Sequence, residues 1–85
     1  MLILMPMPSN PSGFIFSRAI RGEVGSERDV RTIRFITIAG TETEARSTLS
    51  RFVHDQWNFK LTDEGPEVLR QAEELGIVEG DGKLI

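Results

Sequence analysis

The sequence predicts a single small α+β domain with the element order β-β-α-β-α. We expect a three- to four-stranded, mainly antiparallel sheet with both helices on one face. Three observations lead to this fold class. Two segments at 14–20 and 30–39 are rich in aromatic and β-branched residues, two later segments repeat apolar residues at helical spacing, and a strand-like run at 57–62 separates them. With 85 residues, the chain is long enough for one domain.

The first two strands are expected to form a hairpin. In segment 14–20, alternation places Phe14, Phe16 and Ile20 on one face, with Arg18 between them. Residues 21–29 contain two glycines and several charged residues, a composition typical of a hairpin loop.

The second strand is expected at the centre of the sheet. Within 30–39, one face carries Ile33, Phe35, Thr37 and Ala39, and the other carries Ile36 and Ile38. Because both faces are partly apolar, the pattern indicates a strand that is covered at least in part on both sides.

A helix is expected from about residue 42 to 54. Thr41 and Glu44 have the spacing of a capping box, in which the hydroxyl accepts the N3 amide and the glutamate reaches back to the N-cap amide. One helical stripe then follows, formed by Ala45, Leu49, Phe52 and Val53. Glu42 and Arg46 have the spacing of a stabilising ion pair, and His54 falls at the expected C-terminus.

The remaining segments complete the predicted order. Segment 57–62 alternates, with Trp57, Phe59 and Leu61 on one side, and is expected to be a half-buried strand. A second helix is expected over 63–76, with Pro66 in its first turn, Gly76 as its C′ residue and a stripe of Val68, Leu69, Ala72 and Leu75. The end, 77–85, is expected either to form a small hairpin or to dock as one short strand.

Residues 1–12 are expected to be a flexible or strand-like arm that precedes the domain at 13–85. The arm lacks the basic residues and the cleavage site of a signal peptide, and no stretch approaches the roughly 20 apolar residues of a membrane span. The chain has no cysteine, which excludes disulfides, thiolate metal sites and thiol catalysis. These features favour a cytoplasmic protein without a membrane segment.

The candidate catalytic residues are all explained by local structure. Glu42 and Glu44 belong to the expected helix start, and neighbouring His54 and Asp55 would not face each other at a helix end. No phosphate-binding glycine motif is present, and one histidine without cysteine makes a zinc site unusual. We therefore expect no enzymatic activity, no cofactor and no metal.

Charge is divided between the two parts of the chain. Residues 1–54 carry a net charge of +2 and residues 55–85 carry −5, within a total of −3. The basic candidates for partner binding are the arginines of the first hairpin: Arg18, Arg21, Arg28, Arg31 and Arg34. The acidic candidates surround the second helix: Asp63, Glu64, Glu67, Glu73 and Glu74. Either group can be a solvated surface or a binding surface for a charged partner.

The run VRTIRFITIAGTETEARSTLSRF at 30–52 resembles a segment of small phage and prophage proteins, in which a strand near Ala-x-Thr leads into an E-A-R-x-x-L helix. These are short host-takeover proteins, including Icd-like division inhibitors and several anti-CRISPR proteins with small α/β folds. The resemblance implies a non-catalytic protein that binds one host complex and blocks it. It transfers no functional residue to this chain.

Two functional hypotheses follow. The first is a non-catalytic interaction module, a phage or mobile-element inhibitor that binds a host protein or ribonucleoprotein complex of the nucleic-acid machinery through its charged surfaces. The second is a small nucleic-acid-binding regulator that uses the arginine-rich hairpin, with Phe14 and Phe16 to stack bases. A sheet of this size with one open face also favours a homodimer.

Overall fold

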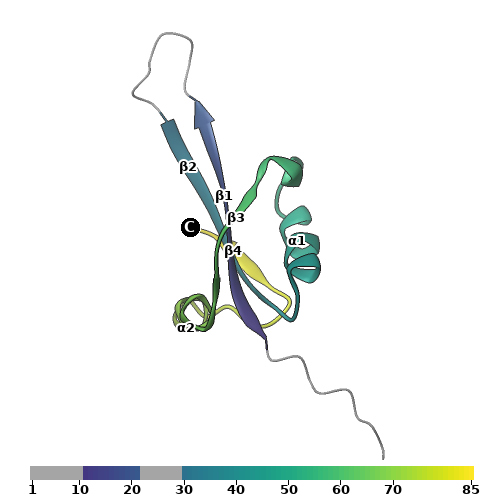
Figure 1. Cartoon of the computed structure of the whole chain (residues 1–85), viewed down its shortest axis with the longest axis vertical. Coiled ribbons are helices and arrows are strands. Elements are labelled where there is room, and N and C mark those ends of the chain that lie inside the picture. The colour runs from purple at the N-terminus through teal and green to yellow at the C-terminus, as the bar shows by residue number, and fades with distance from the viewer. Residues whose placement is uncertain (1–10, 22–29) are drawn as a thin grey trace, which may run out of the picture.

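The computed structural model describes residues 11–21 and 30–85. Along these residues the elements are β1 (Ser12–Arg21), β2 (Val30–Ala39), α1 (Glu42–Ser50), a 3₁₀ turn η1 (Gln56–Asn58), β3 (Lys60–Gly65), α2 (Pro66–Glu74) and β4 (Gly82–Leu84). The four strands form one antiparallel sheet with the order β3-β1-β2-β4 (Figure 1). The predicted α+β fold class and element order are confirmed, with the chain end docked as one short strand.

The β1–β2 hairpin forms the centre of the sheet. Its register pairs Ser12 with Ala39 at one end and Arg21 with Val30 at the other. Because side chains alternate between faces, Phe14 and Phe16 share one face with Phe35. As the alternation in β2 predicted, this strand is central and contributes buried side chains to both faces.

The two helices cover opposite faces of the sheet (Figure 1). α1 packs on a phenylalanine-rich core formed by Phe14, Phe16, Phe35, Ala39, Ala45, Leu49 and Phe59. α2 packs on an isoleucine-rich core formed by Ile15, Ile36, Ile38, Val68, Ala72 and Ile77. The prediction that both helices lie on one face is therefore wrong. Both hairpin strands carry apolar residues at odd and even positions, so each face of the sheet needs its own cover.

The start of α1 agrees with the predicted capping box. The Glu44 amide donates to Thr41 Oγ1 at 3.2 Å, and Glu44 Oε2 accepts the Gly40 amide, one residue before the cap, at 3.1 Å. Arg46 Nε lies 3.2 Å from Glu42 Oε2, as expected for an (i, i+4) pair. The helix ends at Ser50 rather than near residue 54. His54 consequently lies exposed beyond the helix end.

We expect Thr41→Ala to lower the free energy of unfolding by about 1 kcal/mol, because it removes the side chain that accepts the Glu44 amide. Urea denaturation followed by circular dichroism measures the change. Ser47→Ala is the matched control, since Ser47 is exposed on the same helix and uses only its carbonyl in the observed contact with Ser50. Equal stability of the two variants would contradict the cap assignment.

The segment before β3 differs from the predicted strand at 57–62. Residues 56–58 form a 3₁₀ turn, in which the Asn58 amide donates to the Asp55 carbonyl at 2.9 Å and the Phe59 amide to Gln56 at 3.0 Å. This turn directs Trp57 outward, with 74% of its surface exposed, and leaves Phe59 buried. The alternating pattern was correct only from Phe59 onward.

β3 contains a bulge at Thr62. Leu61 pairs with Phe16 and Asp63 pairs with Ile15, so Thr62 is an extra residue on the β3 side. Its hydroxyl donates to the Ile15 carbonyl at 3.2 Å, which ties the bulge to β1. The bulge and the charged residues Asp63 and Glu64 disfavour further pairing along the outer edge of β3.

α2 is shorter than predicted because residues 63–65 belong to β3 instead. Pro66 occupies the first turn, as expected. Gly76 has φ +79° and its amide donates to the Glu73 carbonyl at 2.9 Å, while Ile77 donates to Ala72 at 3.0 Å. These two bonds form a Schellman motif and direct Ile77 into the isoleucine-rich core.

Candidate interaction surface

The residues considered for catalysis do not converge. Within 11–21 and 30–85, no group of three or more His, Asp or Glu side chains is placed to hold a metal ion. Glu42 and Glu44 are engaged in contacts at the start of α1, His54 is exposed beyond the end of that helix, and Asp55 forms an ion pair with Arg18. None of the described helices is long and apolar enough to cross a membrane.

The hairpin arginines whose side chains are described do not all share one face of the sheet. Arg18 lies on the α1 side of the sheet, where its guanidinium forms an ion pair with Asp55. Arg31 is exposed on that same face, whereas Arg34 is exposed on the α2 face. Arg21 ends β1, its side chain is not among those described, and Arg28 lies outside the described residues.

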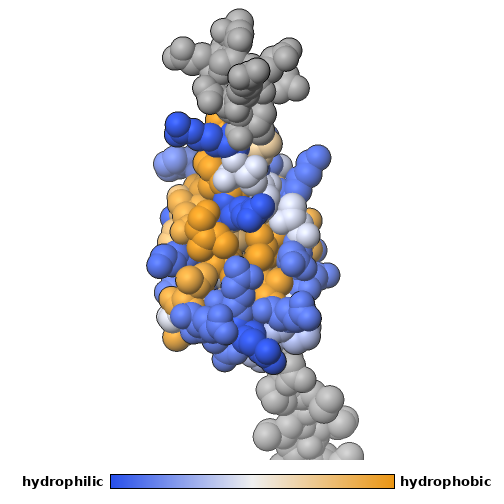
Figure 2. Space-filling model, turned by 90° about the vertical axis from the view of Figure 1, so that its left-hand side faces the viewer, coloured by the Kyte–Doolittle hydropathy of each residue, from blue (hydrophilic) through white to orange (hydrophobic). Residues whose placement is uncertain are grey.

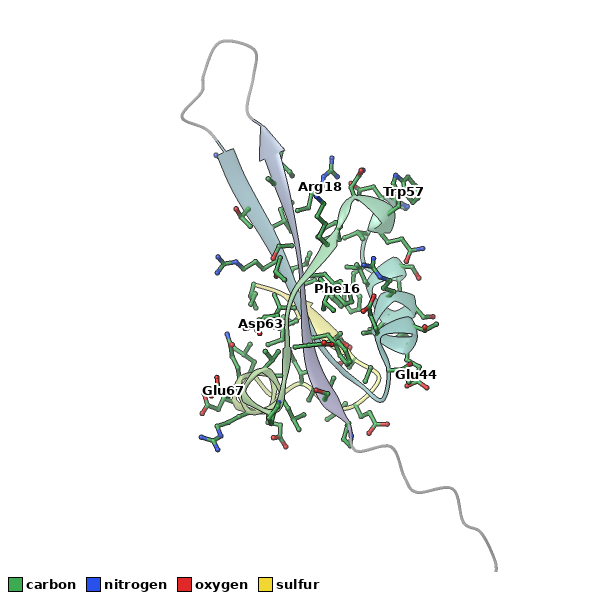
Figure 3. The ribbon with its side chains drawn as sticks, viewed as in Figure 1. Phe16, Arg18, Glu44, Trp57, Asp63 and Glu67 are labelled. Atoms are coloured by element: carbon green, nitrogen blue, oxygen red, sulfur yellow. The ribbon has the colours of Figure 1, made fainter. Side chains whose placement is uncertain are left out.

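The aromatic residues proposed to stack bases are unavailable. Phe14 is 4% exposed and Phe16 is completely buried, because both belong to the core under α1. Figure 3 shows Phe16 within the layer between the sheet and α1. That part of the nucleic-acid hypothesis is therefore wrong.

The acidic candidates gather around α2, away from the hairpin end. Asp63 and Glu64 lie on β3, Glu67 is in the first turn of α2, and Glu73 and Glu74 are in its last turn. Figure 3 shows Glu67 beside α2, Arg18 toward the hairpin end, and Asp63 between them. Asp63 also has a local role, because its carboxylate accepts the Glu64 amide at 2.9 Å. Arg18 and Glu67 thus lie apart, whereas Arg34 and Asp63 line one groove on the α2 face.

The central hairpin extends beyond both outer strands (Figure 1). Pairing of β1 with β3 ends at Ser17, and pairing of β2 with β4 ends at Phe35. The final described contact on the β4 side is the Ile85 amide donating to the Arg34 carbonyl at 2.8 Å. Beyond these points, Arg18–Arg21 and Val30–Ile33 pair only with each other among the described residues.

The direction of the free backbone groups follows from this register. In an antiparallel ladder, the amide and carbonyl of one residue point to the same side, and the side alternates along the strand. Ile38 and Arg34 bond toward the β4 side, so Thr32 also points that way. Ala19, which is opposite Thr32, therefore presents its amide and carbonyl at the free edge of β1.

A cleft of about 370 Å³ lies beside the free edge of β1. Its lining residues are Ser17, Arg18, Ala19, Asn58 and Lys60. The cleft exists because the residues that precede β3 form the 3₁₀ turn η1 instead of a strand. Among the described residues, β1 is therefore paired with β3 up to Ser17 and has no strand on that side from Arg18 onward. Trp57 precedes Asn58 and projects outward at the same end of the molecule as Arg18 (Figure 3). We call Trp57 together with the five lining residues the hairpin-edge surface.

A second, larger groove lies on the α2 face. It has a volume of about 480 Å³ and is lined by Ile15, Ser17, Thr32, Arg34, Thr62, Asp63, Gln71 and Ile85. α2 covers only one end of this face, and Figure 2 shows the open part as an apolar area crossed by polar and charged side chains. Arg34 and Asp63 give the groove both signs of charge.

Sequence reasoning missed most of the hairpin-edge surface. Arg18 was among the candidates, but Asn58, Lys60 and Trp57 were assigned to a regular strand. The strand assignment followed from the alternation of apolar and polar residues in 57–62. No local pattern indicates that the first residues of this run form a 3₁₀ turn.

Comparisons with family models, with curated proteins and with solved structures found no significant match.

Proposed function

We propose that the protein is a non-catalytic interaction module that binds another protein through the hairpin-edge surface. The observation that carries this proposal is the exposure of Trp57, 74%, directly beside a cleft with an unpaired strand edge. Tryptophan is strongly enriched among residues that dominate binding energy at protein interfaces. Trp57 belongs to neither apolar core, so its ring is available for contact with a partner.

The chemistry of the surface favours a protein over a nucleic acid. Asp55 neutralises Arg18, and the two other described hairpin arginines, Arg31 and Arg34, lie on opposite faces of the sheet. A phosphate backbone would require several cations aligned on one side. The total charge of −3 also opposes a nucleic-acid partner.

The partner class follows from the resemblance of residues 30–52 to phage host-takeover proteins. We propose a host protein or ribonucleoprotein complex of the nucleic-acid machinery, which this protein would inhibit by occupying a binding surface. Expression in bacteria should then reduce CRISPR interference or cell division. If both processes remain intact, this partner class is wrong, although the interaction surface itself would still stand.

We expect Trp57→Ala to weaken partner capture at least about tenfold, the loss typical of a central aromatic contact. Tagged full-length protein is used to recover partners from bacterial lysate, and the recovered protein is titrated against each variant. Val78→Ala is the control, because Val78 is also an exposed apolar residue, at 65%, but lies outside the hairpin-edge surface.

Two results would contradict the proposal. One is equal capture by Trp57→Ala and Val78→Ala, and the other is the absence of any specific partner. Retention of labelled DNA or RNA at low salt, with steep loss as salt rises, would instead favour the nucleic-acid hypothesis. In that case Arg31→Glu with Arg34→Glu should abolish the retention.

A further inference from the structure

We infer that the free edge of β1 at Arg18–Arg21 binds an acidic, extended segment of the partner as an added β-strand. This inference rests on the proposed function and specifies how the contact is made. The added strand would continue the sheet where β3 leaves it, so that main-chain hydrogen bonds give affinity and alternate side chains give specificity.

The backbone of β1 supplies the hydrogen-bonding part of this site. Ala19 directs its amide and carbonyl toward the side from which β3 has departed, because it continues the alternation of Ile15 and Ser17. Ile15 and Ser17 lie opposite β3, while Ala19 has no strand beside it among the described residues. An extended peptide that pairs with Ala19 would enter the cleft lined by Asn58 and Lys60.

The side chains around this edge specify an acidic segment. Arg18 is already paired with Asp55, whereas Lys60 is exposed and forms no ion pair within the described part of the chain. Lys60 lies opposite Ser17 at the last pair of the β1–β3 ladder, where an incoming strand would begin. A carboxylate on the residue of the incoming strand that lies next to Lys60 would form an ion pair with it. Asn58 lines the same cleft.

The other sheet edges are less suited to this role. The outer edge of β3 carries the Thr62 bulge and two acidic residues, which would repel an acidic strand. The free edge of β2 at Thr32 faces the chain end at Ile85, and its groove holds the carboxylate of Asp63 as well as the guanidinium of Arg34, so the groove offers no net positive charge to an acidic strand. Charge and shape therefore favour β1.

Proline substitutions at two opposite residues test the strand edge directly. Ala19→Pro removes the outward amide of β1, and Thr32→Pro removes the outward amide of β2 at the same level of the hairpin. Neither amide bonds to the other hairpin strand, and proline is tolerated in edge strands when its missing amide faces outward. Circular dichroism checks that both variants remain folded.

The probe is a fluorescently labelled peptide of alternating valine and glutamate, and fluorescence anisotropy of the full-length protein measures its dissociation constant. We expect Ala19→Pro to weaken binding at least about tenfold and Thr32→Pro to leave it nearly unchanged. Lys60→Gln should also weaken binding, and an alternating valine–lysine peptide should bind less well than the acidic one. Hydrogen exchange should slow at the Ala19 amide when the acidic peptide is added.

Several results would overturn the inference. These are equal effects of the two proline substitutions, equal binding of the acidic and basic peptides, and protection of Thr32 instead of Ala19. Concentration-dependent protection of Ala19 without peptide would identify a second copy of this chain as the occupant and would also overturn it. If Ala19→Pro still captures the natural partner while Trp57→Ala does not, strand addition is wrong but the proposed interaction surface remains.

Discussion

Replacing Gly13 with alanine is expected to destabilise the protein by about 3 kcal/mol, at the upper end for overpacking of a core. A Cβ atom at this position would lie 2.2 Å from the Leu69 amide nitrogen and 2.3 Å from the Val68 carbonyl carbon. These are backbone atoms of α2, so no side-chain rotation relieves the clash. α2 would have to move off the sheet, which would open the isoleucine-rich core.

Gly76→Ala is the control for this prediction. Gly76 has φ +79°, but a Cβ there meets no atom within 4 Å. The same chemical change should therefore cost only about 1 kcal/mol, the penalty for a left-handed backbone. Urea denaturation of both variants gives the comparison. If Gly13→Ala is no less stable than Gly76→Ala, the close approach of β1 to α2 is wrong.

Phe16→Ala is expected to lower the free energy of unfolding by about 3–5 kcal/mol. Phe16 is completely buried at the centre of the phenylalanine-rich core. The Arg46 guanidinium also lies 5.0 Å from the centroid of the Phe16 ring. The substitution therefore removes a cation–π contact in addition to the buried volume of the ring. For a small domain whose total stability is about 5–15 kcal/mol, this loss is large.

Phe52→Ala provides the same chemical change at a less buried position. Phe52 is 44% exposed, although its ring lies 4.9 Å from the Phe35 ring centroid. We expect its loss to cost less than half as much, because water already reaches part of the side chain. Denaturation midpoints measure both effects. Similar losses would show that the interior of the core is not centred on Phe16.

Local signals in the sequence were sufficient to predict the elements whose boundaries depend on local chemistry. Thr41 and Glu44 marked the start of α1, and Gly76 marked the end of α2, because capping involves residues that are close in the chain. The two-sided pattern of β2 also predicted its central place in the sheet. Each of these predictions needed only nearby residues.

The arrangement of the helices required information that local patterns do not contain. Which face a helix covers depends on how long-range pairing orients β1 and β3. Because the hairpin has apolar residues on both faces, its sequence is compatible with two helices on one face or with one helix on each face. The same limit applied to Trp57. Alternation placed it in a strand, but the turn at 56–58 determines its direction, and that turn forms where the chain passes from α1 to β3.

During synthesis, the β1–β2 hairpin is made before the two helices that cover its faces. β1 and β2 are made first, with apolar side chains on both faces. α1 follows soon afterwards and can cover one face, but α2 and Ile77 follow only after α1, η1 and β3. A nascent chain would therefore expose Ile15, Ile36 and Ile38 until α2 and Ile77 have been synthesised. Such exposed strands are prone to aggregate, so chaperone binding during translation would protect this sheet face.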